Sequence, residues 1–437
     1  MLPHVALSLA YLFLFSAIVW KSSWYRMQGI SQRWTLLAFW LKIAAGIVLW
    51  LVYTYHYTYR DTSDSYRFFD DAMIIRNLLH DQPMLFLRFM TGIGLDHPDV
   101  QPVMDQLHGW TSMHNYGLTF DSPTIVRINV GISFFSFGYY HVHTVFMCML
   151  SFSGLVGIFK SFAPYFTHRE GWVFIACFLL PTVVFWSSGV LKEAPLIAAL
   201  GLFIYNGMKL YANGWNNRSV LFVLLAVFFL VYLKIYVIIS MIPSILFLLW
   251  SKKTGNKFLI PSFVAIHIVC FLVAQNAEYF FSGGDFLHIL ERKQTDFYNV
   301  ARDFDAKSTL HIPAITNSVS YFMHYPEALF LALFRPHLGE VKSTFYLLFA
   351  LENLGYMLLL VMTFLRFKLP GKENRAIVLA LLSFVLILGG IIGSTVPVLG
   401  AVVRYRIVIL PFYVLLLAFC IKPMPFSWLK RGSPQGD

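Results

Sequence analysis

Four carboxylic acids lie within eleven residues of this chain, at Asp61, Asp64, Asp70 and Asp71. They directly follow an apolar run, in a sequence whose charged residues make up only 13% of the total. A carboxylate in such a position can take a proton from a hydroxyl group and act as a general base. The crowding of acids beside an apolar segment therefore indicates chemistry at a membrane surface.

Basic side chains recur at the ends of later apolar segments, at Lys192, Lys234, Arg404 and Arg406. Ammonium and guanidinium groups hold the oxygens of a departing phosphate. A reaction that joins an acceptor hydroxyl to a group activated by a lipid phosphate needs such cations together with a general base. We therefore expect the acids and the cations to line one site on the outer side of a membrane.

Composition sets the fold class. Of the 437 residues 58% are hydrophobic, and the mean hydropathy is +0.65, which excludes a soluble core with a polar surface. Because a span needs roughly 20 apolar residues, the sequence predicts an all-α polytopic membrane protein with about eleven transmembrane helices. The predicted spans are 4–20, 35–56, 128–159 (one long or broken span), 172–188, 194–208, 219–233, 236–250, 258–274, 345–365, 376–393 and 405–421. Residues 1–437 are expected to form a single transmembrane domain.

The loops between the spans predict which side the acids face. With this number of spans, the short loops that carry lysine and arginine fall on one side, which is the cytoplasmic side as a rule. The long polar segments 57–127 and 275–344 then lie outside, with the N-terminus outside and the C-terminus in the cytoplasm. The net charge of +11 is scattered over the short loops, which argues against a nucleic-acid partner.

The first long outer loop, 57–127, is expected to contain interfacial helices. Apolar residues recur there at helical spacing and define one side of a helix: they are Phe68, Ala72, Ile75 and Leu79. Asp64, Arg67 and Asp71 share the other side, which we expect to face a cavity. A second short apolar piece, from Pro83 to Met90, follows.

These residues resemble a known family. The segment from Asp64-Ser65-Tyr66 to Ala72 is similar to the acidic motif of the GT-C superfamily of integral-membrane glycosyltransferases. Arg404-Tyr405-Arg406 with Pro411 looks like the basic-aromatic-proline signature near the last helices of that superfamily, and Phe185 to Glu193 is similar to segments of its bacterial envelope-polysaccharide members. The resemblance implies a polyprenyl-phosphate-linked sugar donor, a glycan or lipid acceptor, and a place in the bacterial inner (cytoplasmic) membrane among its lipids.

The resemblance also assigns roles to residues. Asp64 becomes the candidate catalytic base, with Asp61 and Asp71 as rivals, and donor-phosphate binding falls to the four basic residues named above. The further substrate-binding candidates are Tyr66, Arg67, Asp70, Glu193, His114 and Tyr405. Many members carry a second acid where this chain has Ser65. Mg²⁺ or Mn²⁺ is left open as a cofactor, and no residue is assigned to bind a metal.

Other interpretations of the same residues stay open. The acids could form surface ion pairs worth well under about 1 kcal/mol each. Lys192 could pair with Glu193, and Arg404 and Arg406 could extend to outer headgroups. The alternative functions are a transporter or flippase for a lipid-linked glycan or an anionic substrate, and an O-antigen-type polysaccharide polymerase. A flippase would carry ionisable residues deep in several spans, whereas here they cluster at outer ends, which favours a one-sided enzyme site.

Overall fold

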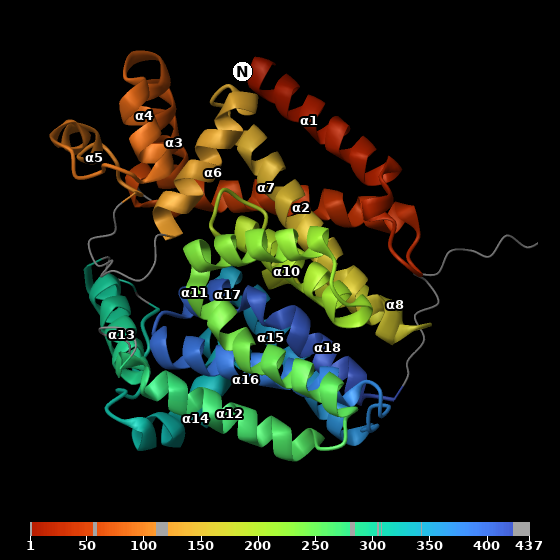
Figure 1. Ribbon diagram of the computed structural model, residues 1–437. Coiled ribbons are helices and arrows are strands. Elements are labelled where there is room, and N and C mark those ends of the chain that lie inside the picture. Colours follow the sequence, from red (N-terminus) through yellow and green to blue (C-terminus); the bar gives the residue numbers. More distant parts are fainter. Residues whose placement is uncertain are drawn as a thin grey trace, which may run out of the picture. The chain divides into compact units, whose positions relative to one another are not determined.

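The computed structural model describes residues 2–55, 59–110, 121–279, 285–303, 306, 308–341 and 343–422 (Figure 1). Within these residues the regular structure is helical, and β structure is limited to two isolated bridges. Seven of the helices are long and apolar enough to cross a membrane, or eight if the bent pair Leu399–Val408 and Leu410–Cys420 forms one span. The prediction of an all-α polytopic membrane protein is thus confirmed at this level.

The count of eleven spans is not reached, because some expected spans are broken. The expected span 172–188 is divided into α8 (Glu170–Phe178) and α9 (Pro181–Trp186). Pro181 has no backbone N–H with which to continue the preceding helix. The expected span 128–159 is likewise divided, at a turn in which Phe137 and Gly138 have positive φ.

Two neighbouring expected spans are joined across a kink, and another is short. Segments 219–233 and 236–250 fall within α11 (Asn217–Thr254), which consists of two helices that meet at the kink. The kink lies at Lys234, whose backbone is non-helical at φ −157° and ψ 82°. The expected span 258–274 forms α12 (Leu259–Gln275), which at 17 residues is a shorter apolar helix.

The described chain divides into two compact units. The first unit comprises the described residues of Met1–Leu179 and Val184–Ile235, and the second those of Leu180–Val183 and Tyr236–Pro425. Besides α8 and the first part of α11, the first unit contains α1 (Leu2–Lys21), η1 (Ser23–Tyr25), α2 (Gln32–Tyr55), η2 (Arg60–Thr62), α3 (Asp64–Asp81), α4 (Pro83–Thr91), η3 (Pro98–Val100), α5 (Gln101–Met104), α6 (Asp121–Ser136), α7 (Tyr140–Phe162), η4 (Ala163–Phe166) and α10 (Glu193–Asn213).

Small residues bring α7 and α10 of the first unit close together. A Cβ atom added to Gly154 would lie 2.3 Å from the carbonyl oxygen of Ile197, and one added to Gly201 would lie 2.0 Å from that of Gly154. Only glycine permits such an approach of two helix backbones, which is a common way for membrane helices to associate. This pair fixes the position of the start of α10.

Helix α3 confirms the periodicity in the sequence. Phe68, Ala72 and Ile75 are buried in one apolar cluster with residues of α4 and α6, and Leu79 is partly buried against it. Helix α4 begins at Pro83, a position where the absent N–H costs no hydrogen bond. The expected helix with one apolar side is therefore present, and it carries the acidic segment (Figure 1).

The second unit is built around α14 and α16, which pack side by side. Its helices are α12, η5 (Ala277–Tyr279), α13 (Phe286–Asp303), α14 (Ser318–Phe334), η6 (Leu338–Glu340), α15 (Thr344–Leu365), α16 (Arg375–Thr395), α17 (Leu399–Tyr405), η7 (Arg406–Val408) and α18 (Leu410–Cys420). The segment 275–344, predicted as the second long outer loop, thus contains the helices α13 and α14.

Candidate functional site

Two of the predicted phosphate-binding lysines meet at one carboxylate in the first unit. The Nζ atoms of Lys192 and Lys234 lie 3.1 Å and 3.2 Å from the same oxygen, Oδ2 of Asp121. Lys192 also donates a hydrogen bond of 2.9 Å to Oγ of Ser122. The side chains of the three charged residues are between 10% and 14% exposed, so the group is nearly enclosed.

Breaks in the helices position these three side chains. Asp121 is the first residue of α6, where the helix dipole favours a negative charge. Lys192 immediately precedes α10, at the end of the non-helical residues that follow α9, and Lys234 is the non-helical residue of α11. Each charged group therefore stands at an end or an interruption of a helix.

The two lysines control the ionisation of Asp121. Burial alone would raise the pKa of its carboxyl group, but the ammonium groups of Lys192 and Lys234 outweigh burial and hold that pKa well below its ordinary value. The carboxylate is therefore ionised at neutral pH. Two ammonium groups are thus gathered beside one carboxylate.

An aromatic ring links the lysine pair to the acidic helix. The Nζ atom of Lys192 lies 5.0 Å from the centroid of the Phe68 ring on α3, within the range of a cation–π contact. Asp64 begins α3 and stands one turn before Phe68. The predicted base and the predicted cations are thus carried on neighbouring elements of one unit.

The other predicted acids of this segment have different surroundings. Asp61 is exposed in η2, and Asp64 is partly buried. Asp70 accepts two hydrogen bonds of 2.7 Å from the guanidinium group of Arg60, in an exposed pair. That guanidinium also lies 4.0 Å above the ring of Tyr66. Asp70 therefore forms the surface ion pair that the sequence left open.

Asp71 and Arg67 bind a neighbouring loop. The buried carboxylate of Asp71 accepts hydrogen bonds from the backbone N–H groups of His108, at 3.0 Å, and Gly109, at 2.8 Å. Arg67 donates to the carbonyl oxygen of His108. Burial raises the pKa of Asp71, and the backbone hydrogen bonds oppose that rise. Through these contacts both residues hold residues 108 and 109 against α3.

Two more predicted substrate-binding residues can be placed, and a third cannot. The hydroxyl group of Tyr66 accepts a hydrogen bond of 2.8 Å from Nε1 of Trp50 and shares one of 2.7 Å with Thr54. Glu193 is buried as the first residue of α10. His114 lies outside the described residues, so its predicted role has no structural counterpart here.

Arg406 belongs to the second unit and is fully buried. Its Nη1 donates to the carbonyl oxygens of Arg335 at 2.9 Å and Leu333 at 3.4 Å, and its Nη2 donates to Oδ1 of Asn353 at 2.7 Å. Two of these partners belong to the C-terminal end of α14, where a cation satisfies the last carbonyl groups. Arg404 is partly buried on α17, and the Tyr405 ring lies 5.9 Å from that of Phe297.

Asp121, the residue that joins the two lysines, was not among the predicted site residues. A signal for it was present, because Asp121-Ser122-Pro123 precedes an apolar segment just as the acids at 61–71 follow one. The same reasoning about acids beside apolar segments would have selected it. Its partners come from positions 71 and 113 residues further along the chain, and no local pattern identifies them.

Neither a metal-binding group nor a related protein identifies the function of this site. Among the residues that the structure describes, no group of three or more histidine, cysteine, aspartate or glutamate side chains is placed to hold a metal ion. The chain matches no family model, no curated protein and no solved structure. The inference of function therefore depends on the chemistry of the residues.

Proposed function

We propose that this chain is a membrane glycosyltransferase that moves a sugar from a polyprenyl-phosphate-linked donor to an envelope glycan or lipid acceptor. The observation that supports the proposal most is the pairing of Lys192 and Lys234 with the single carboxylate of Asp121. Two ammonium groups gathered at one place match the several oxygens of a donor phosphate, which accept charge-assisted hydrogen bonds.

The location and topology form part of the proposal. The protein would lie in a bacterial inner membrane with about eleven spans, the N-terminus outside and the C-terminus in the cytoplasm. The lysine pair and α3 would then face the extracytoplasmic side. The lipid tail of the donor would stay in the bilayer while its phosphate reaches the lysines, which explains a cationic group among apolar helices.

The proposed reaction inverts the configuration of the sugar. The acceptor oxygen forms a bond to the anomeric carbon, and the bond from that carbon to the donor phosphate oxygen breaks with its electron pair left on the phosphate. Asp64 takes the acceptor proton as general base. Lys192 and Lys234 stabilise the charge that develops on the departing phosphate.

The phosphate-binding part is tested with single lysine variants. Lys192→Ala removes one of the two ammonium groups, so we expect the protein to fold and to bind undecaprenyl phosphate at least about tenfold more weakly. Binding is measured with the purified protein in lipid nanodiscs. Lys209→Ala, which changes an exposed lysine of α10, is the control. Unchanged affinity in Lys192→Ala and Lys234→Ala would contradict the proposal.

The catalytic part is tested with matched acid variants of α3. We expect Asp64→Asn to lower turnover by about 100-fold or more, the range of general-base contributions. Asp70→Asn, which changes an exposed acid of the same helix, serves as the comparison. The measurement is the release of undecaprenyl phosphate from a panel of undecaprenyl-phosphate sugars. Full turnover in Asp64→Asn would remove Asp64 as the base.

One observation favours a transporter as the second candidate. Lys42 is buried near the middle of α2, and its Nζ donates a hydrogen bond of 2.6 Å to Oγ of Ser187, beside the break after α9. A cation within a span is typical of translocation paths. Movement of a fluorescent polyprenyl-phosphate lipid across vesicles that is lost in Lys42→Met would support this candidate.

A further inference from the structure

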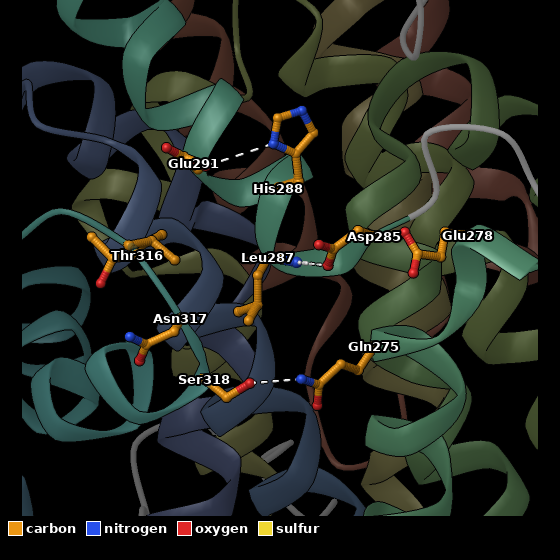
Figure 2. Close-up of a pocket in the computed structure, with 10 residues that line it drawn as sticks. Gln275, Glu278, Asp285, Leu287, His288, Glu291, Thr316, Asn317 and Ser318 are labelled. Atoms are coloured by element: carbon orange, nitrogen blue, oxygen red, sulfur yellow. Dashed lines mark hydrogen bonds and ion pairs between the residues drawn. The ribbon is translucent and has the colours of Figure 1, made fainter.

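A polar cavity of about 420 Å³ lies in the second unit, apart from every residue discussed as a transferase site. Its walls come from the end of α12, from η5, from the start of α13 and from the segment 315–318 (Figure 2). The volume falls within the range of about 300–1,000 Å³ that small-molecule sites occupy. Such sites are mostly apolar, whereas Leu287 and Ile315 are the only apolar residues in this lining.

Part of the cavity lining consists of neutral hydrogen-bonding groups. Gln275 donates a hydrogen bond of 2.8 Å to the Ser318 hydroxyl group, which fixes both side chains at the cavity. The carbonyl oxygen of the Asn317 side chain accepts from the N–H of Ser320 at 2.8 Å, which directs its amide nitrogen to other acceptors. Amides and hydroxyls in this arrangement match the hydroxyl groups of a polyol.

The rest of the lining is acidic. Glu278, Asp285 and Glu291 contribute carboxylates, together with the imidazole of His288, and none of the described lining residues is lysine or arginine. His288 lies 3.6 Å from Glu291, and Asp285 accepts a hydrogen bond of 3.0 Å from the N–H of Leu287. In Figure 2 Glu291 lies on the same side as Thr316 and Gln275 on the same side as Glu278, so a ligand meets both neutral groups and carboxylates on each side. It is therefore expected to carry both hydroxyl groups and a positive charge.

The walls are held in place before any ligand binds. Nε2 of Gln294 on α13 donates to the carbonyl oxygens of Pro313 and Ser394, each at 2.9 Å. The Tyr298 hydroxyl accepts from the N–H of Ile312 at 2.8 Å. These bonds join α13 to the segment that supplies part of the neutral lining, so binding does not require the cavity to form anew.

We propose that this cavity binds an amino sugar, through its protonated amine at the carboxylates and through its ring hydroxyls at the amides and hydroxyls. A divalent cation is disfavoured, since no three metal-binding side chains among the described residues are grouped closely enough.

Binding is tested on the purified full-length protein in nanodiscs by calorimetry. The probe is the β-1,4-linked trimer of glucosamine at about pH 6, where its amines are protonated and aspartate and glutamate are ionised. The neutral trimer of N-acetylglucosamine and the polyamine spermidine are the comparison ligands. We expect the glucosamine trimer to bind at least about tenfold more tightly than either, because each lacks one half of the recognised chemistry.

Variants of the lining acids test whether the glucosamine trimer binds in this cavity. Glu278→Gln and Glu291→Gln should each lower the affinity for the glucosamine trimer by about three- to tenfold. The double variant should lower it further. Asp303→Asn, which changes an acid at the far end of α13, should leave the affinity unchanged. Thermal unfolding of each variant verifies that it is folded.

Three results would overturn the inference. Equal binding of the acetylated trimer would show that the amine is not recognised, and equal binding of spermidine would show that charge alone is responsible. Unchanged affinity in the double variant would place any binding elsewhere. None of these results bears on the lysine pair, since the assay uses no donor and measures no turnover.

Discussion

The lysine pair of the first unit and Arg406 of the second unit look alike in the sequence, and the structure gives them opposite roles. Lys192 and Lys234 lie side by side at one carboxylate, that of Asp121. Arg406 donates through both terminal nitrogens to backbone carbonyls and Asn353. Its Nε has no acceptor among the described residues, and complete burial closes it to a phosphate.

This contrast shows that a cation beside an apolar segment does not by itself indicate a ligand site. The deciding feature is what already satisfies the cation. Carbonyl groups at the end of α14 need a donor whether or not a ligand exists, and Arg406 supplies it. Lys192 and Lys234 instead meet at the side chain of Asp121. The proposed phosphate site therefore keeps the lysines and omits Arg406.

Removing the arginine should have the largest effect on stability. Arg406→Met leaves several buried carbonyl groups and Asn353 without a donor, and each such group costs about 1–3 kcal/mol. We expect the second unit to be destabilised by about 3–5 kcal/mol, which is measured by thermal unfolding in detergent. If Arg406→Met folded normally and lost only phosphate binding, Arg406 would have a ligand-binding role and not the structural role assigned to it.

Removing the shared carboxylate should have the next largest effect. Asp121→Asn leaves two buried ammonium groups side by side without their shared counter-charge, and loss of one partner of a buried pair costs about 3–5 kcal/mol. Phosphate should restore part of this stability and should bind more tightly than to the unchanged protein. The measurement is the unfolding temperature with and without phosphate. A fall in stability with no response to phosphate would contradict an anion site.

The pH dependence of the lysine pair follows from Asp121. Its pKa in the folded protein lies below the ordinary value of about 3.9, so the stabilisation is complete above that pH. It is lost only as the pH falls through the lower, folded-state value. We therefore expect the stability due to this group to persist unchanged from neutral pH to about pH 5. Loss of that stability near pH 6 would show that Asp121 is not held ionised by the lysines.

The smallest effects separate two neighbouring acids of α3. Asp71→Asn replaces a carboxylate that accepts from two backbone N–H groups, which should cost about 1–3 kcal/mol. Asp70→Asn alters an exposed ion pair and should cost less than about 1 kcal/mol. Hydrogen exchange at residues 108 and 109 is the measurement. Faster exchange in Asp70→Asn than in Asp71→Asn would contradict the assigned contacts.

The sequence predicts part of this arrangement. The spacing of Phe68, Ala72 and Ile75 is a local property of one helix, so periodicity was sufficient to place them. The shared partner of the lysines depends on three helices that meet from distant positions, which no local pattern contains. The count of eleven spans is not reached where an expected span is divided, as at Pro181 between α8 and α9.

The most direct measurement is the affinity of undecaprenyl phosphate for Lys192→Ala, Lys234→Ala and Arg406→Lys in nanodiscs. We expect a loss of at least about tenfold in each lysine variant, because one of the two ammonium groups is removed. We expect near-normal affinity in the folded fraction of Arg406→Lys. Unchanged binding in both lysine variants, with loss in folded Arg406→Lys, would contradict it.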